Sequence, residues 1–215
     1  MEECKFYINI GRQFCSGGLY LGKRLSEILN IPYFDKELLN LASRMSGISK
    51  EFFEQADETP SKFTCGFISG GLTSLVGISN YNFNNIIGGN SLFNIQSQVI
   101  RYAADGGSAI FIGRCADYIL RNEKNTLNLF IYADPQDRIT NARKRGSIEN
   151  VDKMSDKQIA DLIKKNDKKR SEYYNYYTFK TWGDKSSYDL CLNISKLGEE
   201  ACIKTILSVI ETKFK

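Results

Sequence analysis

Short apolar runs alternate with amphipathic stretches along most of the chain, a pattern typical of strands that alternate with helices. Residues 5–10 form a largely apolar run bounded by Gly11, which predicts a short strand. Residues 19–30 follow with apolar side chains at helical spacing, which predicts a helix. Residues 31–34 can form a second strand after this helix. The apolar positions of the predicted helix are Leu21, Leu25, Ile28 and Leu29.

The periodic pattern is lost in one long segment. Asp35 stands where an N-cap belongs, before a helical pattern over residues 36–41. From residue 58 to about residue 90 the chain is rich in Gly, Ser and Asn, and its apolar residues follow no clear period. We therefore expect residues 58–90 to be a mobile insertion, partly helical at most, outside the core.

Regular patterning returns at Ser91 and continues to residue 212. Five predicted strands, each leading to helices, indicate an α/β fold in a single domain over residues 1–215, with a five-stranded parallel sheet covered by helices on both faces. Such sheets bind ligands at the carboxyl ends of their strands, which here follow Ile10, Phe34, Ile112, Ala133 and Ile194. The remaining predicted strands are residues 108–112, 126–133 and 188–194, and the remaining helices are residues 91–105, 114–121, a segment opened by Pro135, 155–178 and 199–212.

Composition narrows the cellular setting. Hydrophobic residues make up 42% of the chain and charged residues 25%, which is ordinary for a soluble protein. The apolar runs are far shorter than the roughly 20 residues of a membrane helix, so we expect no membrane partner. Six scattered cysteines without a C-x-x-C pair fit reduced thiols, and we expect a cytoplasmic protein.

The absence of histidine narrows the chemistry further. It excludes Ser-His-Asp and Cys-His catalysis and every His-ligated metal centre, and we assign no metal ligands. Phosphoryl transfer can proceed with the remaining groups, because positioning and charge stabilisation dominate it. The net charge of +4 suits an anionic small ligand. We expect no nucleic-acid partner, because the basic residues concentrate in one segment.

A glycine-rich turn joins the first strand to the first helix. Gly11, Ser16, Gly17 and Gly18 lie in it, and such a turn aims backbone N–H groups at one point beside a helix N-terminus, which makes a phosphate site. The turn departs from the P-loop pattern G-x-x-x-x-G-K-[ST], because Gly18 occupies the lysine position and Leu19 the Ser/Thr position. A plain strand-to-helix turn is the alternative.

Several segments, taken in order, resemble the cytidylate-kinase-like family of P-loop nucleoside monophosphate kinases. The most characteristic is a buried strand followed by Gly113-Arg114-Cys115, which resembles the G-R-D turn of bacterial cytidylate kinases. The resemblance implies a P-loop NTPase fold with a mobile lid, ATP and Mg²⁺ as cofactors, and a nucleoside monophosphate as substrate. It covers nearly the whole chain except residues 58–90. The matching segments are residues 10–18, 35–38, 109–120, 127–138, 173–178 and 188–195.

The resemblance also implies roles for individual residues. Arg114 would bind the acceptor nucleotide, and we expect Asp35 and Asp117 beside it. A guanidinium suits this task because it can fork to two phosphate oxygens or to a base edge. Cys115 replaces the Asp of the motif, and this departure bears on base specificity. A surface salt bridge is the alternative role for Arg114.

Residues 143–172 resemble the kinase lid. Arg143, Arg145 and Arg170 would then close over the transferred phosphate, where cations lower the energy of the transition state. For the lysines of this segment, a solvated helix face is the alternative. The aromatic residues between Tyr173 and Trp182 could stack a base, or they pack a helix end.

The missing lysine requires another cation. Arg12 is the nearest candidate, since it lies in the same turn, and the alternative is that it pairs with Asp35. The expected function is phosphoryl transfer from ATP to a nucleoside monophosphate, CMP or dCMP. Two alternatives stay open: a nucleotide-binding module without kinase activity, and a kinase of another small metabolite.

Overall fold

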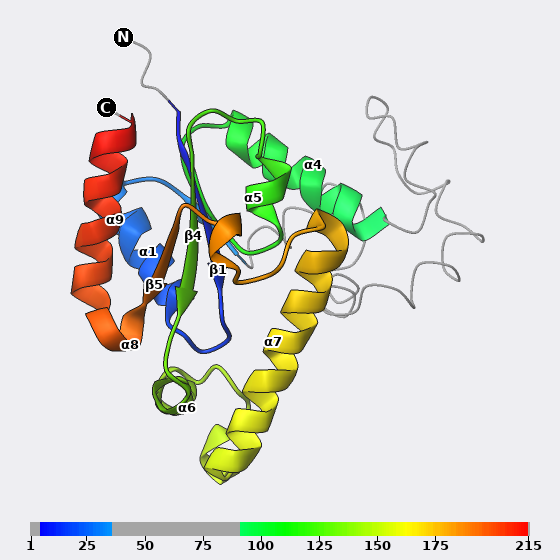
Figure 1. The fold of residues 1–215 in the computed structure, drawn as a ribbon, viewed down its shortest axis with the longest axis vertical. Coiled ribbons are helices and arrows are strands. Elements are labelled where there is room, and N and C mark those ends of the chain that lie inside the picture. The colour runs from blue at the N-terminus through cyan, green and yellow to red at the C-terminus, as the bar shows by residue number, and fades with distance from the viewer. Residues whose placement is uncertain (1–4, 36–90, 215) are drawn as a thin grey trace.

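The computed structural model describes residues 5–35 and 91–214 (Figure 1). The helix predicted over residues 36–41 and the insertion predicted over residues 58–90 lie outside these ranges. The strands are β1 (Tyr7–Arg12), β2 (Tyr33–Phe34), β3 (Ala109–Ile112), β4 (Thr126–Tyr132) and β5 (Leu190–Asn193). The helices are α1 (Gly18–Leu29), α4 (Ser91–Asp105), α5 (Ala116–Ile119), α6 (Pro135–Arg145), α7 (Asp156–Thr178), α8 (Ile194–Leu197) and α9 (Glu199–Phe214), with short 3-10 turns at η3 (Val151–Lys153) and η4 (Lys185–Ser187).

The five described strands form one parallel sheet in the order β2-β3-β1-β4-β5. The central strand β1 pairs with β3 through Tyr7 opposite Ala109, and with β4 through Tyr7 opposite Thr126. Because the strands are parallel, the carboxyl ends of β1, β3 and β4 meet at one edge of the sheet. The predicted fold class is confirmed, and this edge is where the polar turns come together.

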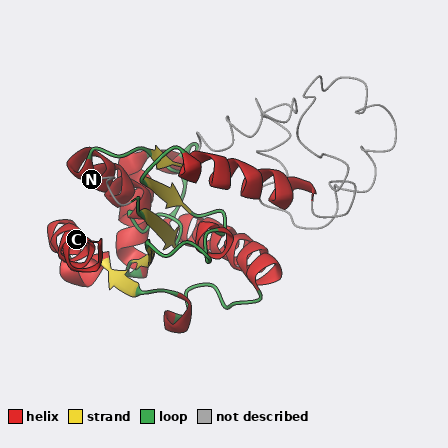
Figure 2. Cartoon of the chain, turned by 90° about the horizontal axis from the view of Figure 1, so that it is seen from above, coloured by secondary structure: helices red, strands yellow, loops and turns green. Residues whose placement is uncertain are grey.

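Helices cover both faces of the sheet (Figures 1 and 2). Ile8 and Ile10 of β1 pack into a core with α1 and α9 on one face. Tyr7 belongs to a second core with α4 and α5 on the other face. Side chains alternate between the two faces of a strand, so Asn9 and Gly11 share the face of Tyr7. None of the described helices combines the length and apolar character needed to span a bilayer.

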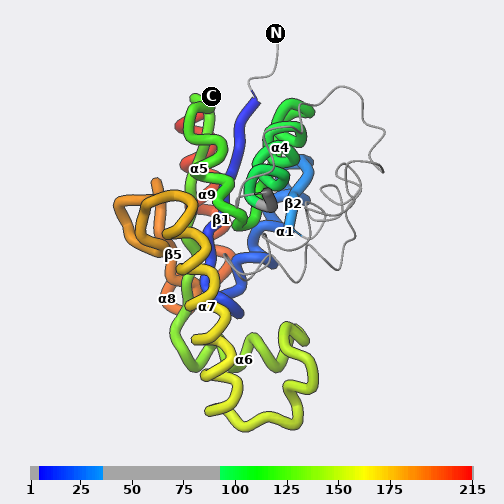
Figure 3. The backbone as a smooth tube through the Cα atoms, turned by 90° about the vertical axis from the view of Figure 1, so that its right-hand side faces the viewer, coloured from blue at the N-terminus to red at the C-terminus, as the bar shows by residue number. Residues whose placement is uncertain are grey.

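Helices α6 and α7 extend beyond the carboxyl edge of the sheet (Figure 3). A separate apolar cluster joins them: Ile139 and Ala142 of α6 pack with Ile159 and Ile163 of α7. Ser155 caps α7, because its hydroxyl accepts from the Gln158 backbone N–H while the Gln158 side chain accepts from the Ser155 N–H. The α6–α7 segment thus has a small core of its own, which the glycine-rich turn also contacts through partly buried apolar side chains.

Helix α1 follows its predicted pattern with one exception. Leu21 and Leu25 are fully buried against the sheet, and Leu29 packs at the margin of the same core. Ile28, predicted on the apolar face, is 47% exposed. The helix touches the sheet through a stripe of residues four apart, and Ile28 lies outside that stripe.

Two truncations on α1 test this packing. Leu25→Ala should lower the free energy of unfolding by about 2–5 kcal/mol, because it leaves a cavity in a core that cannot fully collapse. Ile28→Ala on the same helix should change it by less than about 0.5 kcal/mol, because the side chain is largely solvated. Chemical denaturation of both variants measures the difference. Equal losses would show that the stripe is wrongly placed.

Candidate functional site

The turn between β1 and α1 contains two residues with a left-handed backbone. Cys15 and Gly17 adopt positive φ values of 59° and 96°. Gly17 is the N-cap of α1 and, as a glycine, has no side chain with which to cap the helix. The buried Ser16 hydroxyl accepts a long hydrogen bond of 3.4 Å from the Gly18 N–H. The first turn of α1 therefore presents backbone N–H groups and the positive end of the helix dipole to this loop.

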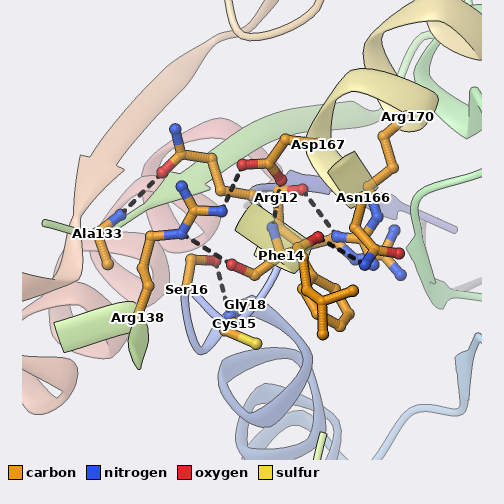
Figure 4. Close-up of polar contacts among 12 residues, drawn as sticks. Arg12, Phe14, Cys15, Ser16, Gly18, Ala133, Arg138, Asn166, Asp167 and Arg170 are labelled. Carbon is orange, nitrogen blue, oxygen red and sulfur yellow. Dashed lines mark hydrogen bonds and ion pairs between the residues drawn. The ribbon is translucent and has the colours of Figure 1, made fainter. Parts of the chain in front are cut away.

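Side chains from α6 and α7 hold the loop from outside (Figure 4). Arg138 Nε donates to the Phe14 carbonyl at 2.8 Å, and the Phe14 N–H donates to Asp167 Oδ1 at 2.7 Å. Arg138 and Asp167 also form a largely buried ion pair. The loop is thereby fixed by one cation and one carboxylate that bond each other. Sequence reasoning missed both residues, because nothing local marks a contact across more than 100 positions.

Three arginines gather where β1 and β3 end. Arg12 ends β1 and forms an ion pair with Asp35 at 3.0 Å, between Nη2 and Oδ1. Arg114 follows β3 in a left-handed conformation with φ of 59°. Arg170 of α7 donates to the Arg12 carbonyl at 3.2 Å, and its guanidinium lies over the Phe14 ring. The three guanidinium groups come from three different elements and line one cavity.

Electrostatics disfavour this crowding in the ligand-free protein. Burial, and then repulsion from Arg12, lower the pKa of Arg114 to about 10. The same two causes lower the pKa of Arg170 to about 9. The carboxylates of Asp35 and Asp167 offset this only in part. Both arginines remain charged at neutral pH, so the cluster is a concentrated positive site suited to a multiply charged anion.

The cavity has a volume of about 110 Å³, and aromatic residues line it in addition to the three arginines. Tyr173, Tyr174 and Trp182, from the predicted aromatic group, line it together with Asp117. Tyr174 Oη donates to Asp117 Oδ2 at 2.7 Å, and burial raises the pKa of that carboxyl. Phe179, another aromatic residue of the group, is 89% exposed. The aromatic cluster thus divides between the cavity wall and the surface.

The predicted lid arginines have three different environments. Arg143 donates to two carbonyls of the α6–α7 connection and pairs with Asp156, so it holds that connection together. Arg170 belongs to the cavity. Arg145 stacks over the Tyr20 ring at 4.7 Å and pairs with Glu199 at 3.5 Å.

Arg145 also lies at the glycine-rich turn. A β-carbon placed on Gly17 would be 3.4 Å from Arg145 Nη1. The guanidinium therefore lies beside the N-terminus of α1, whereas that of Arg12 reaches Asp35. Sequence reasoning favoured Arg12 as the cation of this turn, and the Arg12–Asp35 contact is the alternative it left open.

The described residues offer little for a protein-held metal. No group of three or more His, Cys, Asp or Glu side chains in residues 5–35 and 91–214 could hold a metal ion. Magnesium that accompanies a nucleotide needs few protein ligands, because phosphate oxygens and water supply most of its shell. The site therefore fits phosphate groups better than a metal bound on its own.

Comparison with known proteins gives the family and the fold of the chain. Residues 7–196 match the profile of the Cytidylate kinase-like family. The crystal structure of an uncharacterized protein from Eubacterium ventriosum is similar, with 26% identity, a TM-score of 0.67, and coverage of 97% of this chain and 99% of that chain. Shikimate kinase from Bacteroides thetaiotaomicron shares the fold at 12% identity and a TM-score of 0.55, with the same two coverages. No curated protein matches the sequence.

Gly113 provides a test of the cluster geometry. It has a φ of 81°, and a β-carbon there would lie 1.8 Å from Arg12 Nη1. Gly113→Ala should therefore push the flexible end of Arg12 away from Asp35, and the loss of this ion pair, about 1.5–3 kcal/mol, adds to the strain of a positive φ. Gly146→Ala is the matched control, since its φ is 58° and its surroundings are open. Denaturant unfolding should show the larger loss for Gly113→Ala, and equal losses would contradict the close packing of Arg12.

Proposed function

The chain belongs to the cytidylate kinase-like family, and we propose that it transfers a phosphoryl group from ATP to a nucleoside monophosphate, CMP or dCMP. Family and fold are those of small-molecule kinases. The observation that carries the proposal is the cluster of Arg12, Arg114 and Arg170 beside a glycine-rich turn. One cationic site and one backbone N–H site, side by side, are what a reaction between two phosphate groups requires.

The arginine cluster is the acceptor site in this proposal. A bound phosphate would relieve the repulsion that lowers the pKa of Arg114 and Arg170. The planar forks of guanidinium groups match phosphate oxygens, and hydrogen bonds to charged groups are stronger than neutral ones. Asp35 orients Arg12 through their ion pair. Asp117 and the aromatic wall are left for the rest of the acceptor.

The start of α1 is the donor site. The N–H groups of Gly17 and Gly18 and the side chain of Arg145 would hold the ATP phosphates there. ATP supplies the transferred group, and Mg²⁺ bound to its phosphates would offset their charge. Arg145 supplies the cation that the lysine position lacks, since its guanidinium lies beside Gly17.

Arg170 links the two sites. It contacts the glycine-rich turn through the Arg12 carbonyl and the Phe14 ring, and it lines the cavity with Arg114. Charge spreads over the equatorial oxygens of a phosphoryl group in transfer, so a cation between donor and acceptor stabilises that state. The role of Arg143 is different: it holds the α6–α7 connection, which follows Arg145 at the end of α6.

Nucleotide binding without catalysis is the second candidate. It is favoured by Gly18 and Leu19, which stand where a P-loop has its lysine and its hydroxyl, and by the Glu199 carboxylate that already pairs with Arg145. An ATP-consumption assay against the common nucleoside monophosphates, with binding measured in parallel, separates the two. Turnover with CMP or dCMP supports the proposed kinase activity, and binding without turnover supports the second candidate. Turnover only with another small metabolite would show that this metabolite, and not CMP or dCMP, is the acceptor.

Removal of Arg114 tests the acceptor site. Arg114→Ala should weaken CMP binding about ten- to a hundredfold, because a charge-assisted contact of roughly 1.5–3 kcal/mol is lost. ATP affinity should stay nearly unchanged. Arg121→Ala is the control: Arg121 is exposed and lies just after α5, so its loss should alter neither affinity. Calorimetry with each nucleotide measures the effect, and undiminished CMP affinity would remove Arg114 from the site.

Removal of Arg145 tests the replacement of the lysine. Arg145→Ala should lower both ATP affinity and turnover about tenfold or more, and Arg145→Lys should partly restore them. Lys144→Ala, one residue earlier and exposed, should have no effect. Arg12→Ala should mainly weaken the acceptor. If Arg12→Ala reduces ATP affinity while Arg145→Ala does not, Arg12 is the substitute for the lysine.

A further inference from the structure

Asn9 carries a buried side-chain oxygen that is unsatisfied among the described residues. Asn9 of β1 lines the cavity and is only 2% exposed. Its Nδ2 donates to Asn128 Oδ1 at 2.8 Å. Among the described residues, its Oδ1 has no hydrogen-bond partner. A buried acceptor without a donor is destabilising, so this oxygen is suited to a donor that a ligand brings.

The surroundings of Asn9 differ from the arginine end of the cavity. Along β1, Asn9 precedes Arg12 by three residues, which is roughly 10 Å in a strand. The cavity lining also includes the aromatic side chains of Tyr174, Trp182 and Tyr188, and Tyr188 packs beside Gly11, two residues along β1 from Asn9. Asp117 adds a carboxylate, so this lining has hydrogen-bond acceptors and negative charge, whereas the arginine end has donors and positive charge. A ligand that fits both carries an anion at one end and a ring with N–H donors at the other.

Gly11 makes room for this aromatic wall. A β-carbon there would lie 3.1 Å from Tyr188 Cε1 and 3.0 Å from Phe130 Cδ2. The glycine therefore lets Tyr188 and Phe130 lie against β1, with their ring centroids 5.0 Å apart.

We infer that Asn9 selects the base of the acceptor nucleotide by accepting a hydrogen bond from its exocyclic amino group. This rests on the proposed acceptor site, because the phosphate must lie at the arginine cluster for the ring to reach Asn9. Cytosine carries an amino group where uracil carries a carbonyl oxygen. With uracil, two acceptor oxygens would face each other in a buried site, and Asn9 Oδ1 would stay unpaired. Sites built on a buried hydrogen bond reject such analogues strongly.

Binding to the wild-type protein provides the first test. Calorimetry would compare CMP, UMP and the CMP analogue that carries hydrogen in place of the amino group. We expect CMP to bind about ten- to a hundredfold more tightly than either of the others. Equal affinities, a preference for UMP, or no binding of any of the three would overturn the inference.

Two variants then locate the preference. Asn9→Leu should lower CMP affinity to the level of UMP and leave UMP nearly unchanged. Asn128→Asp is the matched variant. The new carboxylate can only accept, so it would still accept the hydrogen bond from Asn9 Nδ2 and would leave Asn9 Oδ1 free for the ligand. The preference for CMP should therefore remain. A preference that survives Asn9→Leu, or that disappears in Asn128→Asp, would contradict the role of Asn9.

Failure of this inference is distinguishable from failure of the proposed function. Turnover of CMP and UMP at equal efficiency would support the proposed kinase activity and contradict base selection by Asn9. A tenfold or larger preference for CMP in binding, with no phosphoryl transfer to it, would support base selection by Asn9 and contradict the proposed kinase activity.

Discussion

The crowding of three partly buried guanidinium groups at one edge of the sheet is the constraint on which the rest of the site depends. Arg12, Arg114 and Arg170 line one cavity, and burial together with repulsion from Arg12 lowers the pKa values of Arg114 and Arg170. A fold keeps such an arrangement only if other contacts hold the arginines in place. Asp35 and the close approach of Gly113 do this for Arg12. The repulsion that remains is available to bind an anion.

The glycine-rich turn is also held in place by contacts from distant parts of the chain. It lacks the lysine and hydroxyl of a P-loop, but Arg138 and Asp167 hold its backbone from α6 and α7. The segment that supplies these contacts also carries Arg145 and Arg170. Any movement of α6 and α7 relative to the sheet would therefore change the turn, the position of Arg145 and the cavity together. This coupling makes the α6–α7 segment the part of the fold on which catalysis would depend.

The sequence predicts the fold well because its signals are local. Strands with continuous apolar runs and helices with a regular stripe can be recognised without knowing their partners, as Leu21 and Leu25 show. Ile28 was misplaced because periodicity does not give the width of the stripe that touches the sheet. The position of Arg114 after a buried strand brought it to the carboxyl edge, as expected. Its roles and those of the other site residues stay predictions.

Other parts of the site could not be predicted. Asn9 is a polar residue inside an apolar run, and its proposed role can be inferred only from the cavity that it lines on one face of β1. The contact between Arg145 and the turn depends on how α6 ends, more than 100 residues after Gly17. Such pairings are set by topology, and no local pattern records them.

The most direct test of the account is the thermal unfolding of Arg114→Met with and without CMP. If the cluster is held against repulsion for an anionic ligand, the ligand-free variant should be at least as stable as the wild type, because one buried charge is gone. CMP should raise the unfolding temperature of the wild type and raise that of the variant much less. A loss of about 3–5 kcal/mol in the ligand-free variant, as expected for breaking a favourable buried ion pair, together with full stabilisation by CMP, would contradict the account.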